Sequence, residues 1–150
     1  MLFIAEKPSV GRAIAEQLGI IHKSDGYIDC KGNHTVTWCF GHLFELAEPD
    51  VYLGSVPAED GKKLWRLEDL PIIPQKWIIQ PKKDCKKQIK VMADLLKKNS
   101  CVVNCGDPDR EGQLLIDELL EYQKYSGTVK RYFILLNSFI CDTRNFTCSS

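Results

Sequence analysis

The chain has 150 residues with 20 acidic and 20 lysine or arginine side chains, so its formal net charge at pH 7 is zero. This length suffices for one domain that buries roughly two thirds of its unfolded surface, and the balanced charge excludes nucleic-acid binding by bulk charge alone. No apolar run is long enough to cross a bilayer, and the first residues lack the basic flank and length of a signal peptide. With seven cysteines, an odd number, these features indicate a reducing, cytoplasmic location and no membrane partner.

The first expected element is a short apolar strand over residues 2–5, followed at once by Glu6. A helix is expected over 8–18, because a proline opens this segment, Ser9 can cap it and Gly19 can end it. Its apolar side chains recur at helical spacing. Glu6 is therefore expected at the carboxyl end of a strand, where open α/β sheets place their ligands.

The middle of the chain changes period several times. Apolar residues alternate over 27–40 around a Lys-Gly-Asn turn, which predicts a β-hairpin inserted in the sheet. Residues 47–76 have no period and are expected to form a long loop held by large apolar side chains, namely Trp65, Leu67, Leu70 and Trp77. A helix is expected over 82–98, and its many lysines indicate a solvated face rather than a DNA-binding one.

A second strand is expected at the apolar run 101–103, and three carboxylates follow it at alternate positions, Asp107, Asp109 and Glu111. Side chains two apart point the same way on an extended chain, so Asp107 and Asp109 can aim at one point. Glu111 is expected to open the following helix, over 111–122.

These carboxylates outline a metal site. If the strands that precede Glu6 and Asp107 are parallel neighbours, the two side chains and Asp109 meet at one edge of the sheet. Crowded like charges cost stability unless a cation neutralises them, and a few hard oxygen ligands suit Mg²⁺. The alternative is a solvated turn in which the acidic residues only cap a helix.

A last strand is expected over 129–136. The order strand, helix, hairpin, helix, strand, helix, strand predicts an α/β fold, a mostly parallel sheet with helices on both faces. Residues 1–136 would form one domain. Residues 137–150 would be a divergent tail, disordered or only loosely packed, because the segment from Ile140 onward has no core-forming period.

Several motifs in order carry a resemblance to one family. Glu-Lys-Pro-Ser at 6–9 and Gly-Asp-Pro-Asp-Arg-Glu-Gly at 106–112 resemble the two halves of a Toprim domain, a Rossmann-like fold. In the residues of these motifs they resemble the amino-terminal domain of type IA DNA topoisomerases of the topoisomerase III kind. Gly-His-Leu at 41–43 and the Trp, Leu-Pro, Pro, Trp pattern over 65–77 resemble the same domain. The chain is therefore similar to an amino-terminal fragment of such an enzyme.

The resemblance implies a mechanism and a role for each site residue. In a type IA enzyme a tyrosine attacks a backbone phosphate of single-stranded DNA, which leaves a 5′-phosphotyrosyl link and a free 3′-hydroxyl. Glu6, Asp107 and Asp109 are the implied catalytic residues, with Glu6 as the acid–base group on the leaving oxygen. The same three residues and Glu111, as an outer ligand, are the implied ligands of Mg²⁺.

Three further side chains are implied to contact DNA. Lys7 and Arg110 would pair with phosphates, although they could equally pair with the neighbouring carboxylates. His42 would touch phosphate or phosphotyrosine, or would serve only as a turn histidine. None of the tyrosines stands in the family's nucleophile context, so the chain is expected to be inactive alone. No small-molecule substrate is expected.

A second class of function remains open. The chain could be a self-standing Toprim protein: a Mg²⁺-dependent nuclease of the old-family kind, a primase-like piece or a nucleic-acid-binding module. The Glu-Lys-Pro-Ser and Gly-His-Leu matches favour the topoisomerase interpretation.

Overall fold

The chain folds into strands and helices, which the computed structural model describes over residues 1–52, 67, 70–135 and 138–142. The strands are β1 (Leu2–Ala5), β2 (Ile20–Ser24), β3 (Tyr27–Cys30), β4 (His34–Trp38), β5 (Phe44–Leu46), β6 (Ile79–Pro81), β7 (Cys101–Cys105), β8 (Thr128–Leu135) and β9 (Ser138–Asp142). The helices are α1 (Pro8–Leu18), α2 (Lys86–Lys98) and α3 (Arg110–Tyr122), with short 3-10 turns η1 (Pro49–Val51) and η3 (Lys83–Cys85).

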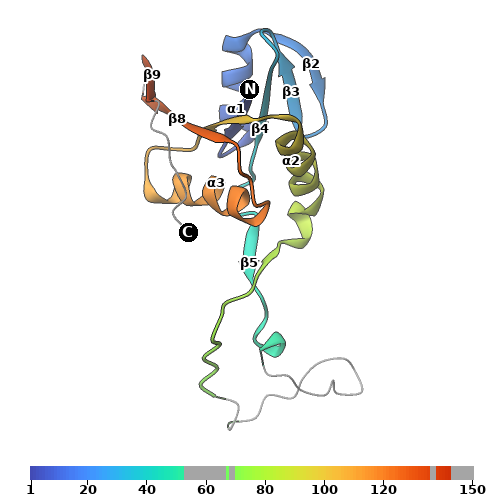
Figure 1. The fold of residues 1–150 in the computed structure, drawn as a ribbon, viewed down its shortest axis with the longest axis vertical. Coiled ribbons are helices and arrows are strands. Elements are labelled where there is room, and N and C mark those ends of the chain that lie inside the picture. The colour runs from blue at the N-terminus through green and yellow to red at the C-terminus, as the bar shows by residue number, and fades with distance from the viewer. Residues whose placement is uncertain (53–66, 68–69, 136–137, 143–150) are drawn as a thin grey trace.

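One sheet organises these elements, with the strand order β2-β3-β4-β1-β7-β8-β9 (Figure 1). Its central strands β4, β1, β7 and β8 are parallel to one another. The edges are antiparallel, with β2 and β3 on one side and β9 on the other. The predicted α/β fold with a mostly parallel central sheet is therefore confirmed, and the predicted hairpin is formed by β3 and β4.

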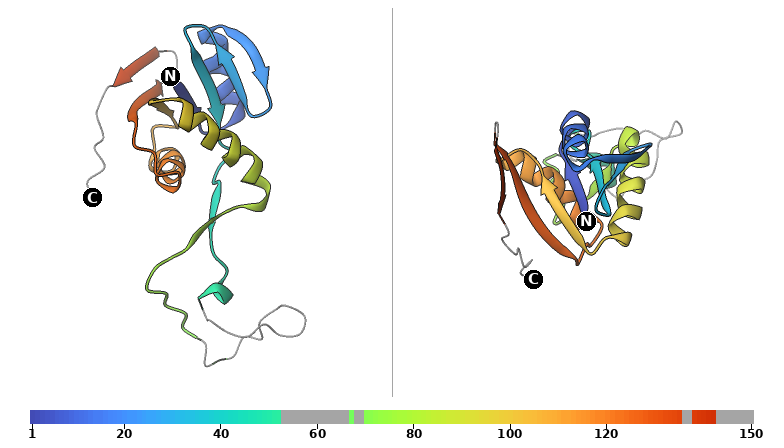
Figure 2. Two further views of the ribbon diagram at one scale, coloured as in Figure 1. Left: turned by 45° about the vertical axis from the view of Figure 1, so that its right-hand side comes forward. Right: turned by 90° about the horizontal axis from the view of Figure 1, so that it is seen from above.

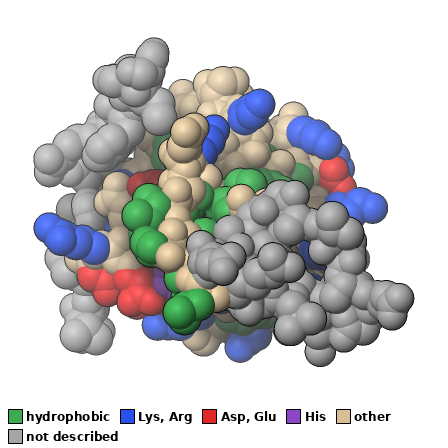
Figure 3. Space-filling model, turned by 90° about the horizontal axis from the view of Figure 1, so that it is seen from below, with side chains coloured by type: hydrophobic (Ala, Val, Ile, Leu, Met, Phe, Trp, Pro, Cys, Tyr) green, Lys and Arg blue, Asp and Glu red, His purple; other side chains and the backbone are tan. Residues whose placement is uncertain are grey.

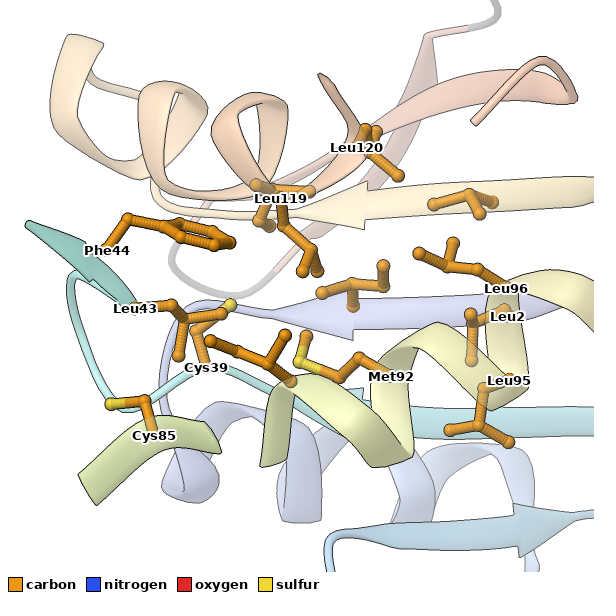
Figure 4. Close-up of a cluster of buried hydrophobic side chains, with 14 residues drawn as sticks. Leu2, Cys39, Leu43, Phe44, Cys85, Met92, Leu95, Leu96, Leu119 and Leu120 are labelled. Atoms are coloured by element: carbon orange, nitrogen blue, oxygen red, sulfur yellow. The ribbon is translucent and has the colours of Figure 1, made fainter. Parts of the chain in front are cut away.

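Helices cover both faces of this sheet, as predicted. On one face, α2 and α3 pack against β1 and β7 through a cluster of buried apolar side chains that includes Leu2, Met92 and Leu119 (Figure 4). On the other face, α1 packs against β3 and β4 through a second cluster that includes Ile14 and Val36. Burial of these two apolar layers is the main favourable term that holds the sheet between its helices.

The helix ends follow local chemistry. Lys7 occupies the N-cap position of α1 with extended backbone and Pro8 is in the first turn, so Ser9 lies inside the helix and does not cap it. Gly19 ends α1 with a φ of 82°, a value that favours glycine. A 3-10 turn precedes α2, which therefore begins four residues later than expected. None of the helices in the described part of the chain is both long and apolar enough to cross a bilayer.

A two-stranded arm leaves the body of the molecule (Figure 2). It starts with β5 and β6, which pair with each other in a separate antiparallel sheet. Three of the four expected anchors of the long loop do not reach the core: Leu67 is 89% exposed and Trp77 is 57% exposed, and Leu70 is also exposed. The Trp77 ring instead packs edge-on against Tyr52, 5.9 Å away. Trp65 lies outside the described residues.

The last described strand departs from the expectation for the tail. β9 pairs antiparallel with β8 over Ser138–Asp142, so residues 140–142 take part in a strand that their sequence does not predict. Main-chain pairing with β8 can form a strand without an apolar period, because it uses backbone groups that every residue carries. Residues 137 and 143–150 of the expected tail lie outside the described residues.

Candidate metal and nucleic-acid site

The site is built where two neighbouring strands end. β1 and β7 are parallel and in register, with Ala5 opposite Cys105, so the residues that follow them leave the same edge of the sheet. Glu6 follows β1 directly, and its Oε2 accepts a hydrogen bond from the Asp107 backbone N–H at 3.1 Å. The sheet thus brings Glu6 and the backbone of Asp107 together across 101 residues of sequence, at the shared edge that the sequence predicts.

Two glycines allow the β7–α3 loop to close tightly on the first turn of α3. A Cβ on Gly106 would lie 2.1 Å from the carbonyl oxygen of Gly112. A Cβ on Gly112 would lie 2.6 Å from the Asp107 nitrogen and 2.8 Å from Glu6 Oε2. Any side chain at either position would push the loop away from Glu6, because the atoms it meets include backbone. Asn104, buried in β7, also holds the loop by accepting from the Gly106 N–H at 3.0 Å.

Asp109 serves as the N-cap of α3. Its Oδ1 accepts from the Gly112 N–H at 2.7 Å, which satisfies one of the free donors at the helix start. The helix-capping alternative is therefore realised at this residue, and the helix opens with Arg110 rather than Glu111. Both Asp109 and Arg110 are exposed to solvent.

The carboxylates do not assemble into a closed cluster. Within residues 1–52, 67, 70–135 and 138–142, no group of three or more His, Cys, Asp or Glu side chains is arranged to hold a metal ion. The donor chemistry nonetheless fits Mg²⁺, which prefers carboxylate oxygens. Glu6 contacts the β7–α3 loop, and this loop carries the carboxylates of Asp107 and Asp109. Glu6 contacts the Asp107 backbone N–H, while the Asp109 carboxylate is turned to the helix start. The convergence of the three carboxylates on one ion therefore stays a prediction.

Lys7 provides the positive charge beside Asp107. Its Nζ lies 3.3 Å from Asp107 Oδ2, and both side chains are about half exposed. The alternative left open for Lys7, pairing with a neighbouring carboxylate, is therefore the arrangement observed. The ammonium occupies the side of Asp107 where a cation would be attracted, so Lys7 and a metal ion are expected to compete for this carboxylate.

Replacing Lys7 with methionine is expected to enlarge the stabilisation that Mg²⁺ gives to the folded chain, since Asp107 then lacks its neutralising partner. The measurement is the shift in melting temperature between EDTA and excess Mg²⁺, for the wild-type chain and for Lys7→Met. Lys97→Met, which removes an exposed lysine on α2, should leave the shift unchanged. A smaller Mg²⁺ shift in Lys7→Met than in the wild type would show that Lys7 helps to hold the ion's ligands.

His42 lies beside α3, where acidic side chains gather next to a histidine on the face shown in Figure 3. Its Nε2 is 3.4 Å from Glu111 Oε1, and its Nδ1 is 3.9 Å from Glu118 Oε2. Glu111 is largely exposed and points to His42, not to Glu6. Sequence reasoning missed Glu118, although a spacing of seven residues places it on the same face of the helix as Glu111.

Arg131 is a second residue that sequence reasoning missed. It is buried in β8, beside Asn104 of β7, and its Nη2 donates to the backbone carbonyl of Asp107 at 2.8 Å. The guanidinium therefore fixes the loop from the side opposite Glu6. A basic pair inside an otherwise apolar strand, Lys130 and Arg131, was the available signal.

A buried thiol lies close to Glu6. The Cys39 N–H donates to the carbonyl of Ala5 at 2.9 Å, and burial, followed by the charges of Glu6 and Cys85, raises the pKa of the Cys39 thiol to about 12. The thiol therefore stays protonated at neutral pH and is not a nucleophile. Among the described cysteines, Cys30, Cys39, Cys85 and Cys101 are not in disulfides.

Comparison with known proteins identifies the family of this chain. The Toprim domain family profile matches residues 1–136. The chain belongs to the Toprim domain family. Three relatives are each named DNA topoisomerase 3. The one from Haemophilus influenzae is 54% identical over 128 residues, which is 84% of this chain and 19% of the relative. The one from Pasteurella multocida is 52% identical over 127 residues, 83% of this chain and 18% of the relative.

The third, from Staphylococcus epidermidis, is 38% identical over 135 residues, which is 89% of this chain and 18% of the relative. The predicted likeness to the Toprim domain of topoisomerase III enzymes is confirmed by these matches. The Toprim chain spans about a fifth of the length of the relatives that it matches.

Proposed function

We propose that this Toprim chain is the Mg²⁺-binding part of a type IA DNA topoisomerase that cleaves, passes and religates single-stranded DNA. The observation that carries the proposal is the contact between Glu6 and the Asp107 loop at the carboxyl edge of the sheet. It is supported by the similarity to proteins named DNA topoisomerase 3. Such a role places the protein in the cytoplasm, with DNA as its partner and without a membrane or small-molecule partner.

Each residue has a part in the proposed reaction. Glu6, held by the Asp107 amide, would give a proton to the leaving 3′-oxygen and take it back when the strand is rejoined. Glu6, Asp107, Asp109 and, as an outer ligand, Glu111 would hold Mg²⁺, which supplies charge balance for a phosphate when bound. Lys7, released from Asp107, and Arg110 would pair with DNA phosphates. His42 would face the strand from beside Glu111.

The nucleophile of the reaction is proposed to lie outside these 150 residues. The Tyr52 hydroxyl accepts from the Ile78 N–H in the arm, and the Tyr125 hydroxyl donates to Asn99 at the opposite edge of the sheet. Neither is near Glu6. A chain that carries the acid–base group and the metal ligands, but no tyrosine in the family's nucleophile context, would be inactive alone.

We therefore expect the purified chain neither to relax supercoiled plasmid nor to form a covalent DNA adduct in Mg²⁺. Gel analysis of plasmid topology and trapping of denatured protein–DNA complexes test both expectations. A trapped phosphotyrosyl product would contradict the proposal that the nucleophile lies outside these 150 residues. Mg²⁺-dependent cutting of single strands, abolished by Glu6→Gln, would instead support the alternative of a self-standing nuclease.

A further inference from the structure

A hollow of about 370 Å³ lies beside the candidate site, at the same edge of the sheet. Trp38 ends β4, which pairs with β1 so that Trp38 is opposite Ala5, the residue before Glu6. Pro8, directly after Lys7, forms another part of its wall. The side chains that matter most to its chemistry are Arg12, Asp25, Trp38, Phe40, Asp84 and Lys87. The hollow therefore continues the surface on which Glu6 and Lys7 lie.

Its aromatic wall is held in place from behind. Gly11 of α1 packs against the Trp38 ring so closely that a Cβ there would lie 2.8 Å from it. Gln88, buried in α2, donates to the Trp38 carbonyl at 2.8 Å and to the Gly26 carbonyl at 3.0 Å. Phe40, the next aromatic residue along the chain, is 55% exposed. A fixed indole and an open phenyl ring thus face the hollow without reorganisation.

The charges of the rim decide what the hollow can accept. Arg12 and Lys87 are cationic, but Asp25 pairs with Lys87 and Asp84 adds a second carboxylate. Balanced charge does not favour a free phosphate anion. It suits a nucleobase, because aromatic rings stack on its faces and carboxylates accept hydrogen bonds from its amino groups. The cations can meet the backbone phosphates on either side.

We propose that this hollow binds one nucleobase of the single strand whose phosphate is held at the Glu6–Asp107 site. The inference rests on the proposed function and adds a base-binding position to it. The volume is at the lower end of the range of small-ligand pockets, which suits a single nucleotide. Stacking on an aromatic side chain tolerates every base, so the position would order the strand without reading its sequence.

Trp38 can report directly on its own occupancy. The chain has three tryptophans, so the double variant Trp65→Phe/Trp77→Phe leaves Trp38 as the single emitter. Titration with a short unlabelled oligothymidylate in Mg²⁺ should quench its fluorescence to saturation, because a stacked base quenches indole emission. Added to this background, Phe40→Ala should raise the dissociation constant about tenfold. A loss of this size lies within the range measured when an aromatic side chain that stacks on a base is replaced by alanine.

The control variant is Ile21→Ala, which removes another exposed apolar side chain, 67% exposed and on β2 outside the hollow. It should bind the strand as tightly as the background. An oligonucleotide with abasic positions keeps its phosphates but should lose most of the quenching.

Several outcomes would overturn the inference. Binding detected by anisotropy of a labelled strand without quenching of Trp38 would do so, as would equal quenching by the abasic strand or equal affinities of the two alanine variants. If Mg²⁺ raises the melting temperature but no strand binds, the proposed base binding in the hollow is wrong and the proposed metal site is still supported. If Mg²⁺ does not raise the melting temperature and no strand binds, the proposed function is wrong as well.

Discussion

Replacing Gly106 with alanine is expected to lower the free energy of unfolding by about 3 kcal/mol, at the upper end of the usual cost of overpacking. The added Cβ would lie 2.1 Å from the Gly112 carbonyl oxygen, and this atom belongs to backbone in the first turn of α3. It cannot turn aside as a flexible side chain would. For a chain of this size the loss corresponds to a fall in melting temperature of roughly 10 °C.

The same substitution should also remove the Mg²⁺ response, because the loop that carries Asp107 must move away from Glu6. Gly41→Ala is the matched control. Gly41 has a positive φ of 73° and nothing within 4 Å of the added Cβ, so only backbone strain should cost stability there, on the order of 1 kcal/mol. Thermal melting in EDTA and in Mg²⁺ measures both effects. Equal losses in the two variants would show that the close approach at Gly106 is not what holds the loop.

The sequence predicts the elements whose own apolar residues recur at the spacing of a helix or a strand. α1 and α3 are found within a residue of their expected bounds, because their apolar residues recur at helical spacing. For α1, a proline also marks the start and Gly19 marks the end. Strands β2, β5 and β6 are not predicted, because they are short or exposed and exist through pairing with a partner strand. Such pairing depends on the assembled sheet, so the residues within one strand do not predict it.

The site shows the same division. That Glu6 and Asp107 share an edge follows from the rule that parallel strands end together, and the structure agrees. The direction of the Asp109 carboxylate could not be predicted, because an aspartate before a helix can serve equally as N-cap or as metal ligand. Arg131 escaped notice because its contact with Asp107 is made to a backbone carbonyl, which leaves no mark on the sequence near residue 107.

The two roles open to Asp109 can be separated by a pair of substitutions. Asparagine caps helices as well as aspartate does, so Asp109→Asn should keep the bond from the Gly112 N–H and nearly wild-type stability in EDTA. Alanine cannot accept this bond, so Asp109→Ala should lose about 1 kcal/mol. Both variants lack the carboxylate, and both should lose most of the Mg²⁺ response.

Asp107→Asn completes the set and should abolish the Mg²⁺ response at little cost in EDTA, because both side chains of the Lys7–Asp107 pair that it removes are about half exposed to solvent. For the wild-type chain, Mg²⁺ at a hundred times its dissociation constant would stabilise the fold by about 2.7 kcal/mol. Asp94→Asn, an exposed aspartate on α2, should keep that full response.

The measurement is thermal melting of the five proteins in EDTA and across a Mg²⁺ titration. If Asp107 and Asp109 act together, their asparagine variants respond alike and differ from Asp94→Asn at every Mg²⁺ concentration. A full Mg²⁺ response in Asp109→Asn, together with the loss of stability in Asp109→Ala, would assign Asp109 to the helix cap alone. The ion would then have to be held by Glu6 and Asp107, the two residues that the sheet itself brings into contact.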